Sequence, residues 1–495
     1  MRPRNKEIQM SIVRRKVAGV LLLFVAQALS AGNSPAKGPL RAHPTNPRYF
    51  TDGSGRAIYL TGSHNWNNLA DSKLPLVFDY DAYMDMLEKH GHNFIRLWRT
   101  WEQVKFTYGS SEATPPPGGG FSYVELSPWP RIGPGIALDG KPKFQLKQFD
   151  QKYFDRLRSR VSSAGKRGFY VSVMLFEGHG ALLSQAPWCW DGHPFHVKNN
   201  LNGIDGDPDG DGRGVEVYTL RIPAITALQE AYVRKVIDTV NDLDNVLYEI
   251  ANETTTYSTE WQYHLIDFVH DYEKRKPKQH PVGMSFQAFR RGKGDPVFTN
   301  ETLFRSRADW ISPYAACFGQ LPGANTCKDG YGDDPPAADG AKVIINDSDH
   351  VFGIGGDRMW VWKSFTRGLN TAYMDPMGPT FQWRRMNKVW DLEDARRAMG
   401  HTLRFAKRMD LARMVPRGDL ASTKYCLANP AAEYLIYSPD GGNISVDLTA
   451  ALGTLRVEWF DPATGKSTPG GSTKGGAKRT FTPPLAGDAV LYLRK

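Results

Sequence analysis

The sequence has little cysteine and lacks the short motifs of several large functional classes. Its 495 residues include four cysteines and no Cys-x-x-Cys pair, which argues against a zinc site. There is no G-x-G-x-x-G or Walker sequence to favour a nucleotide-binding sheet. Basic residues form neither a cluster nor a nucleic-acid-binding motif, so we expect no nucleic-acid partner. Beyond the N-terminus, no stretch is long and apolar enough to span a membrane.

The N-terminus is typical of an export signal. Six Lys and Arg residues flank or precede "VAGVLLLFVAQAL", a run of about 13 residues that ends in small residues near Ala31. We expect residues 1–31 to be a cleaved signal peptide, with an uncleaved anchor as the alternative, and the protein to be secreted or periplasmic. This leader carries half of the formal charge of +10, so the rest is only mildly basic. Export permits disulfides, and Cys317 and Cys327, which close a short loop, are the expected pair.

Strand-like and helix-like stretches alternate through most of the chain, which is 41% hydrophobic and 23% charged. This alternation predicts a parallel sheet, and eight cycles predict a (β/α)₈ barrel over residues 32–415. An open, doubly wound sheet is the alternative. The strand candidates are Ala57–Trp66, Asn93–Trp101, Phe169–Glu177 and Val246–Glu253, followed by four that begin near Pro281, Asp309, Lys342 and Asn370.

The pattern changes near Pro416. Short strand-like stretches such as "EYLIYSPDGGNISVDL" and "DAVLYLRK" are separated by Gly, Pro and Asp turns. They predict a small all-β sandwich over residues 416–495. We expect this domain to pack on the outside of the barrel and to carry no catalysis.

The fourth strand candidate, "VLYEIANE", carries two glutamates where a buried strand would normally carry none. Alternation puts Glu249 and Glu253 on one face, roughly 13 Å apart along the strand. Chemistry in such barrels occurs at the C-terminal ends of the strands. Glu253 is therefore the candidate catalytic acid at the mouth, and Glu249 is expected to be structural and paired inside the barrel.

A second carboxylate would complete a glycosidase site, which needs one protonated and one ionised carboxyl group. "AKVIINDSDH", the seventh strand candidate, ends on Asp347 and Asp349, which would share one face if the strand continued. Asp349 would then lie one step further out.

These residues resemble the site of clan A retaining glycoside hydrolases. In that clan an Asn-Glu pair ends strand four, as Asn252 and Glu253 do here, and the Glu is the acid/base. The resemblance implies that Asp347 is the nucleophile, in place of the usual Glu, with Asp349 as the alternative. Thr254 stands where Pro often follows the pair. The chain is also similar to apiosidase-like families, whose barrel precedes a β-domain labelled "putative collagen-binding", which "WFDPATGK" resembles.

Other candidate residues lie at the strand tips. By the same resemblance, Arg96 would lie beside the nucleophile and keep it ionised, and Tyr314 would hydrogen-bond it. Tryptophans near these tips could stack on sugar rings, namely Trp98, Trp101, Trp129, Trp188, Trp190 and Trp360. The candidate substrate-binding residues are His64, Trp66, Arg96, Trp98, Glu177, His179, Trp190, Asn252, Tyr314 and His350.

The loop "DGDPDGDGRGVE" has the spacing of a calcium-binding loop, D-x-D-x-D-G-x₅-E. Gly210 would provide the sharp turn, and we expect structural Ca²⁺ and no organic cofactor. A solvated Asp/Gly turn is the alternative, and no helices obviously flank the loop. The candidate ligands are Asp205, Asp207, Asp209, Asp211 and Glu216.

Together these features predict an exported glycoside hydrolase that acts on a polysaccharide or oligosaccharide with retention of configuration. An inverting enzyme with Asp349 or Glu177 as its base is one alternative. A non-catalytic carbohydrate- or matrix-binding protein is another, and the Asp in place of Glu is its main support.

Overall fold

The computed structural model describes residues 34–69, 78–98, 105–107, 121–124, 126–178, 190–289, 299–314, 330–353, 355–378, 380–383 and 388–495. The expected signal peptide, the expected Cys317–Cys327 pair and His179 lie outside these residues. Within them, no helix is long and apolar enough to cross a membrane.

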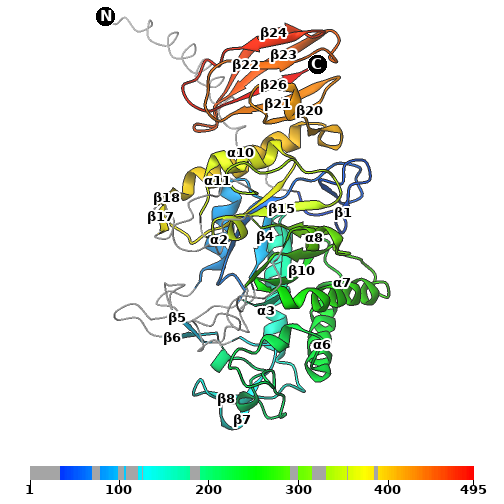
Figure 1. Cartoon of the computed structure of the whole chain (residues 1–495), viewed down its shortest axis with the longest axis vertical. Helices are drawn as coiled ribbons and strands as arrows, with labels where there is room; N and C mark the ends of the chain where they lie inside the picture. Colours follow the sequence, from blue (N-terminus) through cyan, green and yellow to red (C-terminus); the bar gives the residue numbers. More distant parts are fainter. Residues whose placement is uncertain are drawn as a thin grey trace, which may run out of the picture.

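Eight parallel strands close into a barrel, as the sequence predicts (Figure 1). Closure rules out the open, doubly wound alternative. Each strand pairs only with parallel neighbours, in the spatial order β10-β12-β14-β15-β16-β3-β4-β9. The strands are β3 (Thr61–Asn65), β4 (Phe94–Leu97), β9 (Tyr170–Glu177), β10 (Val246–Asn252), β12 (Val282–Ser285), β14 (Trp310–Ser312), β15 (Val343–Asp347) and β16 (Asn370–Met374).

Helices follow most strands and cover the outside of the barrel. The first of them begins at Tyr80, because the Asp79 side chain accepts a hydrogen bond from the backbone N–H of Ala82. The described residues between β14 and β15 contain no helix. The helices are α2 (Tyr80–Lys89), α3 (Gln151–Lys166), α6 (Pro223–Val240), α7 (Thr259–Glu273), α8 (Glu301–Arg305), α9 (Ser348–Val351), α10 (Arg358–Thr366) and α11 (Leu392–Arg408).

Short elements decorate the barrel. Four antiparallel pairs are β1 (Arg41–Ala42) with β2 (Phe50–Thr51), β5 (Lys105–Thr107) with β6 (Phe121–Tyr123), β7 (Arg131–Ile136) with β8 (Pro142–Phe144), and β17 (Thr380–Trp383) with β18 (Lys388–Asp391). A parallel pair joins β11 (Thr254–Thr255) to β13 (Gln287–Phe289). The 3₁₀ helices are η1 (Val197–Asn199), η2 (Val215–Tyr218), η3 (Thr256–Ser258), η5 (Leu411–Arg413) and η6 (Gly418–Leu420).

The N-terminal end of the barrel interior is filled by apolar side chains. Phe94, Tyr170 and Trp310 are the first residues of their strands, and they form one buried cluster with Leu247. Gly283 makes room for the Trp310 ring, because a Cβ there would lie 1.9 Å from it. With this end plugged, the polar side chains of the interior lie towards the C-terminal end.

The C-terminal domain is antiparallel. A six-stranded sheet has the order β19-β20-β21-β26-β23-β24, and a two-stranded pair joins β22 to β25. The strands are β19 (Val415–Pro416), β20 (Cys426–Asn429), β21 (Glu433–Ser438), β22 (Ile444–Asp447), β23 (Thr454–Phe460), β24 (Ser467–Lys474), β25 (Lys478–Phe481) and β26 (Ala489–Arg494).

One face of the six-stranded sheet packs on the barrel helices α10 and α11 (Figure 1). The Trp362 ring of α10 stacks on Tyr437 with centroids 6.0 Å apart, and Phe405 of α11 meets Phe460 at 5.2 Å. Arg358, the first residue of α10, donates to Asp488 at 3.0 Å. The sheet therefore covers apolar helix surface, as the sequence analysis expected.

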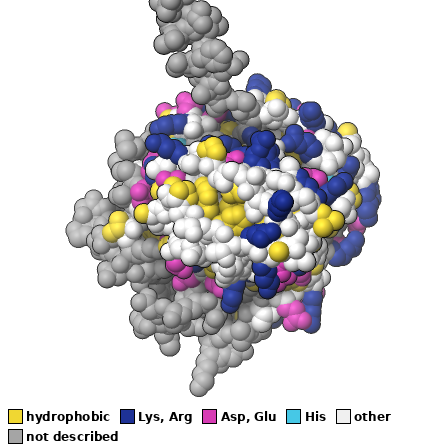
Figure 2. Space-filling model, turned by 90° about the horizontal axis from the view of Figure 1, so that it is seen from above, with side chains coloured by type: hydrophobic (Ala, Val, Ile, Leu, Met, Phe, Trp, Pro, Cys, Tyr) yellow, Lys and Arg dark blue, Asp and Glu magenta, His cyan; other side chains and the backbone are white. Residues whose placement is uncertain are grey.

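On the outer face of the C-terminal domain, basic side chains predominate over acidic ones (Figure 2). In Figure 2, which views the molecule from that end, Lys and Arg side chains border a hydrophobic patch on several sides and alternate with acidic and uncharged ones. This distribution agrees with the mild basic excess outside the leader.

Removing the C-terminal domain by truncation at Val415 is expected to leave little soluble protein. Truncating one buried Phe or Trp typically costs about 3–5 kcal/mol, and this cut uncovers both Trp362 and Phe405. The total approaches the stability of a whole domain, about 5–15 kcal/mol. Soluble yield and Tm, measured beside the full chain, check this. A stable truncate with altered linkage specificity would contradict it.

Candidate active site

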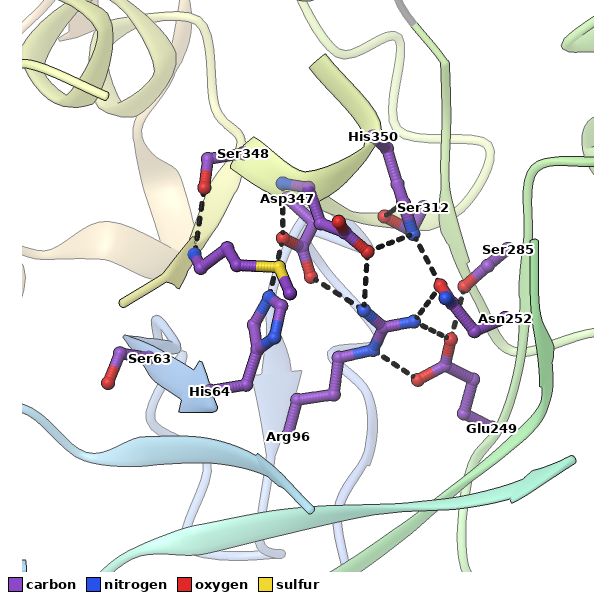
Figure 3. A network of polar contacts seen from close by, with 12 residues as sticks. Ser63, His64, Arg96, Glu249, Asn252, Ser285, Ser312, Asp347, Ser348 and His350 are labelled. Carbon is purple, nitrogen blue, oxygen red and sulfur yellow. Dashed lines mark hydrogen bonds and ion pairs between the residues drawn. The ribbon is translucent and has the colours of Figure 1, made fainter. Parts of the chain in front are cut away.

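Arg96 of β4 is the centre of a buried polar network at the C-terminal end of the barrel (Figure 3). Its Nε and Nη2 donate to the two oxygens of Glu249 at 2.7 and 2.5 Å, and Ser285 Oγ donates to Glu249 at 2.6 Å. Glu249 is fully buried. The two charges stabilise each other in this pair. Glu249 is therefore paired inside the barrel, as expected.

Asn252 links this ion pair to its neighbours. Its Oδ1 accepts from Arg96 Nη2 at 2.6 Å and from His350 Nε2 at 3.1 Å. Its Nδ2 donates to Glu177, with contacts of 3.2 and 3.4 Å to the two oxygens. His350, held in turn by Ser312 Oγ at 2.6 Å, is fully buried. Burial holds the pKa of His350 well below its usual range, so the imidazole is neutral and serves to fix Asn252.

Simple alternation fails near the end of β10. Ile250 and Ala251 both pack in the core cluster outside the barrel, and Asn252 then turns inward to Arg96. In the neighbouring strand β9, Leu175 and Phe176 likewise both pack in the outer core cluster, immediately before Glu177. Glu177 lies opposite Asn252 in the register of the two strands. The expectation that Glu249 and Glu253 share a face by strict alternation is therefore corrected.

Glu253 follows β10 with a left-handed backbone, φ +45°, which is costly for a residue with a side chain, about 1–3 kcal/mol. The next residue helps to hold this geometry. Thr254 Oγ1 contacts Ser258 Oγ at 2.7 Å and accepts from Gln262 Nε2 at 2.9 Å. Such strain is typical of functional sites, and Glu253 is 5% exposed.

Strand β15 ends at Asp347, and the chain then turns into the short helix α9. Asp347 Oδ1 accepts from the backbone N–H of Asp349 at 2.9 Å, which caps the helix, and from His64 Nε2 at 2.9 Å. Arg96 Nη1 contacts Oδ2 of both aspartates at 3.4 Å. Contrary to the prediction, Asp349 does not continue strand β15; it lies in α9, and its carboxylate contacts the same guanidinium as that of Asp347.

The surroundings push the carboxyl pKa values apart. Burial alone would raise the pKa of Asp347, but His64 and Arg96 hold it well below its usual range. Burial raises the pKa of Glu253 well above its usual range, and the charges of Asp349 and Glu177 raise it further. Burial and the Asp347 charge also raise the pKa of Asp349, although Arg96 opposes them. Asp347 therefore stays ionised, while Glu253 and Asp349 both bind protons more readily than ordinary carboxyl groups, which suits acid–base chemistry.

Aromatic and sulfur side chains lie beside this network. Trp98 stacks on His64 with centroids 5.3 Å apart and lies 5.0 Å from the Arg96 guanidinium. Trp98 forms a small apolar cluster with Met174, Met374 and the half-buried Trp66. Tyr314 stacks on Phe286 at 4.9 Å.

Three tryptophans expected near the strand tips lie in packed surroundings instead. Trp190 is 3% exposed and packs on His193 at 4.9 Å, so the sequence-based assignment of this ring to sugar stacking is corrected. Trp129 packs on Phe195, and Trp360 is buried against Phe352. Trp101 and Trp188 lie outside the described residues.

Sequence reasoning missed Ser285 and Ser312, which orient Glu249 and His350. Each is the last residue of its strand, so the position that singled out the other candidates could have found them. It also missed Met374, at the tip of β16.

The Asp/Gly loop brings three of its five predicted ligands together. Carboxylate oxygens of Asp207, Asp209 and Glu216 lie within 4.8 Å of one another. Asp207 Oδ1 is buried and accepts no hydrogen bond. Burial and neighbouring carboxylates raise the pKa of Asp207 and of Glu216. This oxygen-only donor set fits Ca²⁺.

The other two predicted ligands brace the loop. Asp205 accepts from the Asp207 backbone N–H and Asp211 from that of Arg213. Gly210 has φ +73°, as the expected sharp turn requires. The 3₁₀ helix η2 follows the loop, so it is not an EF-hand.

The fold and these side chains define a (β/α)₈ barrel with a buried carboxyl cluster at its mouth and an antiparallel C-terminal domain. Residues 121–289 match the family described as a domain of unknown function (DUF6298). Residues 413–494 match the "putative collagen-binding domain of a collagenase". None of the curated proteins matches the chain.

Solved structures share the whole architecture. A glycoside hydrolase family 5 protein from Bacteroides vulgatus is 16% identical, with a TM-score of 0.58, and the match covers 94% of this chain and 95% of that one. A second structure, titled as a glycoside hydrolase, is 14% identical with a TM-score of 0.54, and the match covers 92% of this chain and 97% of that one. At these identities the likeness establishes the fold.

Proposed function

We propose that the protein is an exported glycoside hydrolase that cleaves O-glycosidic bonds of a polysaccharide or oligosaccharide with retention of configuration. The observation that carries the proposal is the cluster at the mouth. Glu253 has a strained backbone and a raised pKa. The carboxylates of Asp347 and Asp349, which contribute to this pKa, both contact Arg96. The glycoside hydrolases with the same fold support it.

Glu253 is the general acid and base in this proposal. Its carboxyl proton passes to the glycosidic oxygen as the bond to the leaving sugar breaks, while a carboxylate attacks the anomeric carbon from the other side. Glu253, now ionised, then takes a proton from the water that hydrolyses the glycosyl–enzyme bond. The raised pKa keeps the proton on Glu253 for the first step.

The geometry favours Asp349 as the nucleophile over Asp347, the residue that the resemblance implies. Asp347 caps α9, bonds His64 and contacts Arg96, so its carboxylate serves as an anchor. Asp349 is the more exposed, 6% against 1%. Among the nearby charges, that of Asp349 raises the pKa of Glu253 most.

A shared proton would give this pair its two roles. Two buried, neighbouring carboxyls bind the first proton more tightly than the second, so over an intermediate pH range the pair holds one. The contact with Arg96 favours the charge on Asp349 and leaves the proton on Glu253.

The proposal is tested by reducing-end release from xyloglucan, arabinoxylan, galactomannan, pectin, β-1,3-glucan and an apiose-terminated oligosaccharide, which probes the apiosidase-like resemblance. Proton NMR of the first product reports its anomeric form. The variant Glu253→Gln serves as the inactive control. An inverted product would support the alternative with Glu177 or Asp349 as base. Binding of a glycan without release of reducing ends would support the non-catalytic alternative.

We further propose that Ca²⁺ is held by Asp207, Asp209 and Glu216 and orders the loop around them. Three carboxylates repel one another and are stabilised by a divalent cation, and the uncompensated Asp207 Oδ1 is available to it.

Chelation is expected to destabilise the protein. Adding EGTA should lower Tm by several degrees, because a ligand at 100 times its Kd stabilises the folded state by about 2.7 kcal/mol. Adding back Ca²⁺ should restore Tm, and Asp207→Asn with Glu216→Gln should lower Tm in Ca²⁺ and make it insensitive to EGTA. An unchanged Tm and unchanged activity in EGTA would contradict the site.

A further inference from the structure

A groove lies between the segment after η2 and the start of α7. Its volume is about 340 Å³, and an adjoining pocket adds about 130 Å³. The two share Thr219, Arg221 and Tyr257, and the groove is further lined by Leu220, Glu260 and Trp261.

The groove lies near the barrel mouth. Tyr257 comes four residues after Glu253, within η3, and the segment of Thr219 follows Tyr218 directly. The Tyr218 hydroxyl donates to the backbone oxygen of Glu177, the last residue of β9, at 2.8 Å. Both walls are therefore anchored to strands whose tips carry the carboxyl cluster.

The walls combine exposed apolar surface with charged groups. Tyr257 is 38% exposed and Leu220 43% exposed, over the fully buried Trp261, whose indole N–H donates to Gln229 at 2.9 Å. The exposed Arg221 and Glu260 lie on the same walls. A ring face with a guanidinium and a carboxylate beside it matches a pyranose, which offers C–H groups on its faces and hydroxyls at its edge.

We propose that this groove binds a sugar unit of the same glycan chain whose bond is cleaved at Glu253, several units from that bond. The proposal rests on the proposed function. Its occupant follows from the anchoring of both walls to β9 and β10, whose tips carry the carboxyl cluster, and the volume of the groove falls within the 300–1,000 Å³ of typical small-ligand sites. Tyr257 is the stacking platform, and Arg221 and Glu260 bind hydroxyls.

The groove also connects with the acidic loop. Glu216 lines the adjoining pocket and belongs to the carboxylate cluster of that loop. A cation there would fix one wall of the pocket, so removal of Ca²⁺ should weaken binding of long glycans more than cleavage of short ones.

The test compares chain lengths. Oligosaccharides of two to eight units, from whichever polysaccharide of the panel is cleaved, are assayed with the p-nitrophenyl glycoside of the same sugar. Tyr257→Ala should raise KM for the longest oligosaccharide roughly 3- to 10-fold and leave the aryl glycoside unchanged. Tyr257→Phe keeps the ring and should behave like the native protein, as should Leu452→Ala, which alters an exposed residue of the C-terminal domain. Equal losses on all substrates, or no loss on any, would overturn the inference.

A binding measurement separates this inference from the proposed function. Affinity electrophoresis of Glu253→Gln in gels containing each soluble polysaccharide of the panel should show retardation that Tyr257→Ala reduces. If the native protein cleaves nothing but its retardation depends on Tyr257, the groove stands and the hydrolase proposal fails. If cleavage occurs and neither retardation nor KM depends on Tyr257, the proposal for the groove is contradicted and the hydrolase proposal is not.

Discussion

Replacing Glu253 with alanine is expected to lower kcat by about 10²–10⁴-fold on natural glycans, the usual contribution of a general acid. The loss should be much smaller on aryl glycosides with good leaving groups, because they leave without a proton. Azide should restore the rate on such substrates through the space that the side chain vacates, and it should give a glycosyl azide of the same anomeric form as the substrate. Steady-state kinetics and NMR of the azide product measure both effects.

Glu88→Ala is the control, because this glutamate is exposed on α2, away from the cluster. An equal loss on aryl glycosides and natural glycans, without azide rescue, would remove Glu253 from the acid/base role.

The rate should also depend on pH with a definite sign. Glu253 must carry a proton for the first step, so activity falls as pH rises through its pKa, which burial and the Asp349 and Glu177 charges raise. Activity falls at low pH when the nucleophile gains a proton. Because Glu253 titrates above the usual range of a carboxyl group, the basic limb of the native profile should be displaced upward, and Glu253→Ala should abolish that limb on aryl glycosides.

The second large effect concerns the two aspartates. Asp349→Gly should lose activity on every substrate, on the order of 10⁴-fold or more, because no covalent intermediate can form without the nucleophile. Azide should then yield a glycosyl azide of the opposite anomeric form. Asp347→Gly should also be impaired, through loss of the α9 cap and the His64 contact, but azide should not rescue it.

The reverse pattern, with Asp347→Gly rescued by azide and Asp349→Gly retaining most of its rate, would return the nucleophile to the residue that the resemblance implies. If neither substitution mattered, strand seven would not supply the nucleophile, and the binding-protein alternative would gain support. Asp391→Gly removes the aspartate that likewise caps α11 and therefore controls for loss of a cap.

The barrel and its strand tips could be predicted because they depend on local patterns. Alternating strand and helix periods, with a helix cap such as Asp79, are visible in the sequence itself. That Glu249 is paired followed from physics alone, since a buried carboxylate needs a partner, but its partner Arg96, two strands away on β4, was predicted only to lie beside the nucleophile.

The inward turn of Asn252 and the placement of Asp349 could not be predicted in this way. The orientation of Asn252 depends on a break in side-chain alternation that β9 and β10 share. The placement of Asp349 depends on the end of β15 and the start of α9. Such departures are set by packing between strands, which a single sequence does not reveal. Trp190 was misassigned for a related reason, because a tryptophan in a loop after a strand can face either the cleft or the loop's own core.

The apolar plug at the N-terminal end of the barrel has a consequence for how a glycan moves. With Phe94, Tyr170 and Trp310 packed across that end, a polymer cannot thread through the interior that the described strands enclose. A long chain has to lie across the mouth, and each product departs by the route along which the substrate arrived. Repeated cleavage of one chain without release would therefore require the chain to slide sideways over the rim. The affinity for sugar units distant from the cleaved bond would then determine the number of cleavages per binding event.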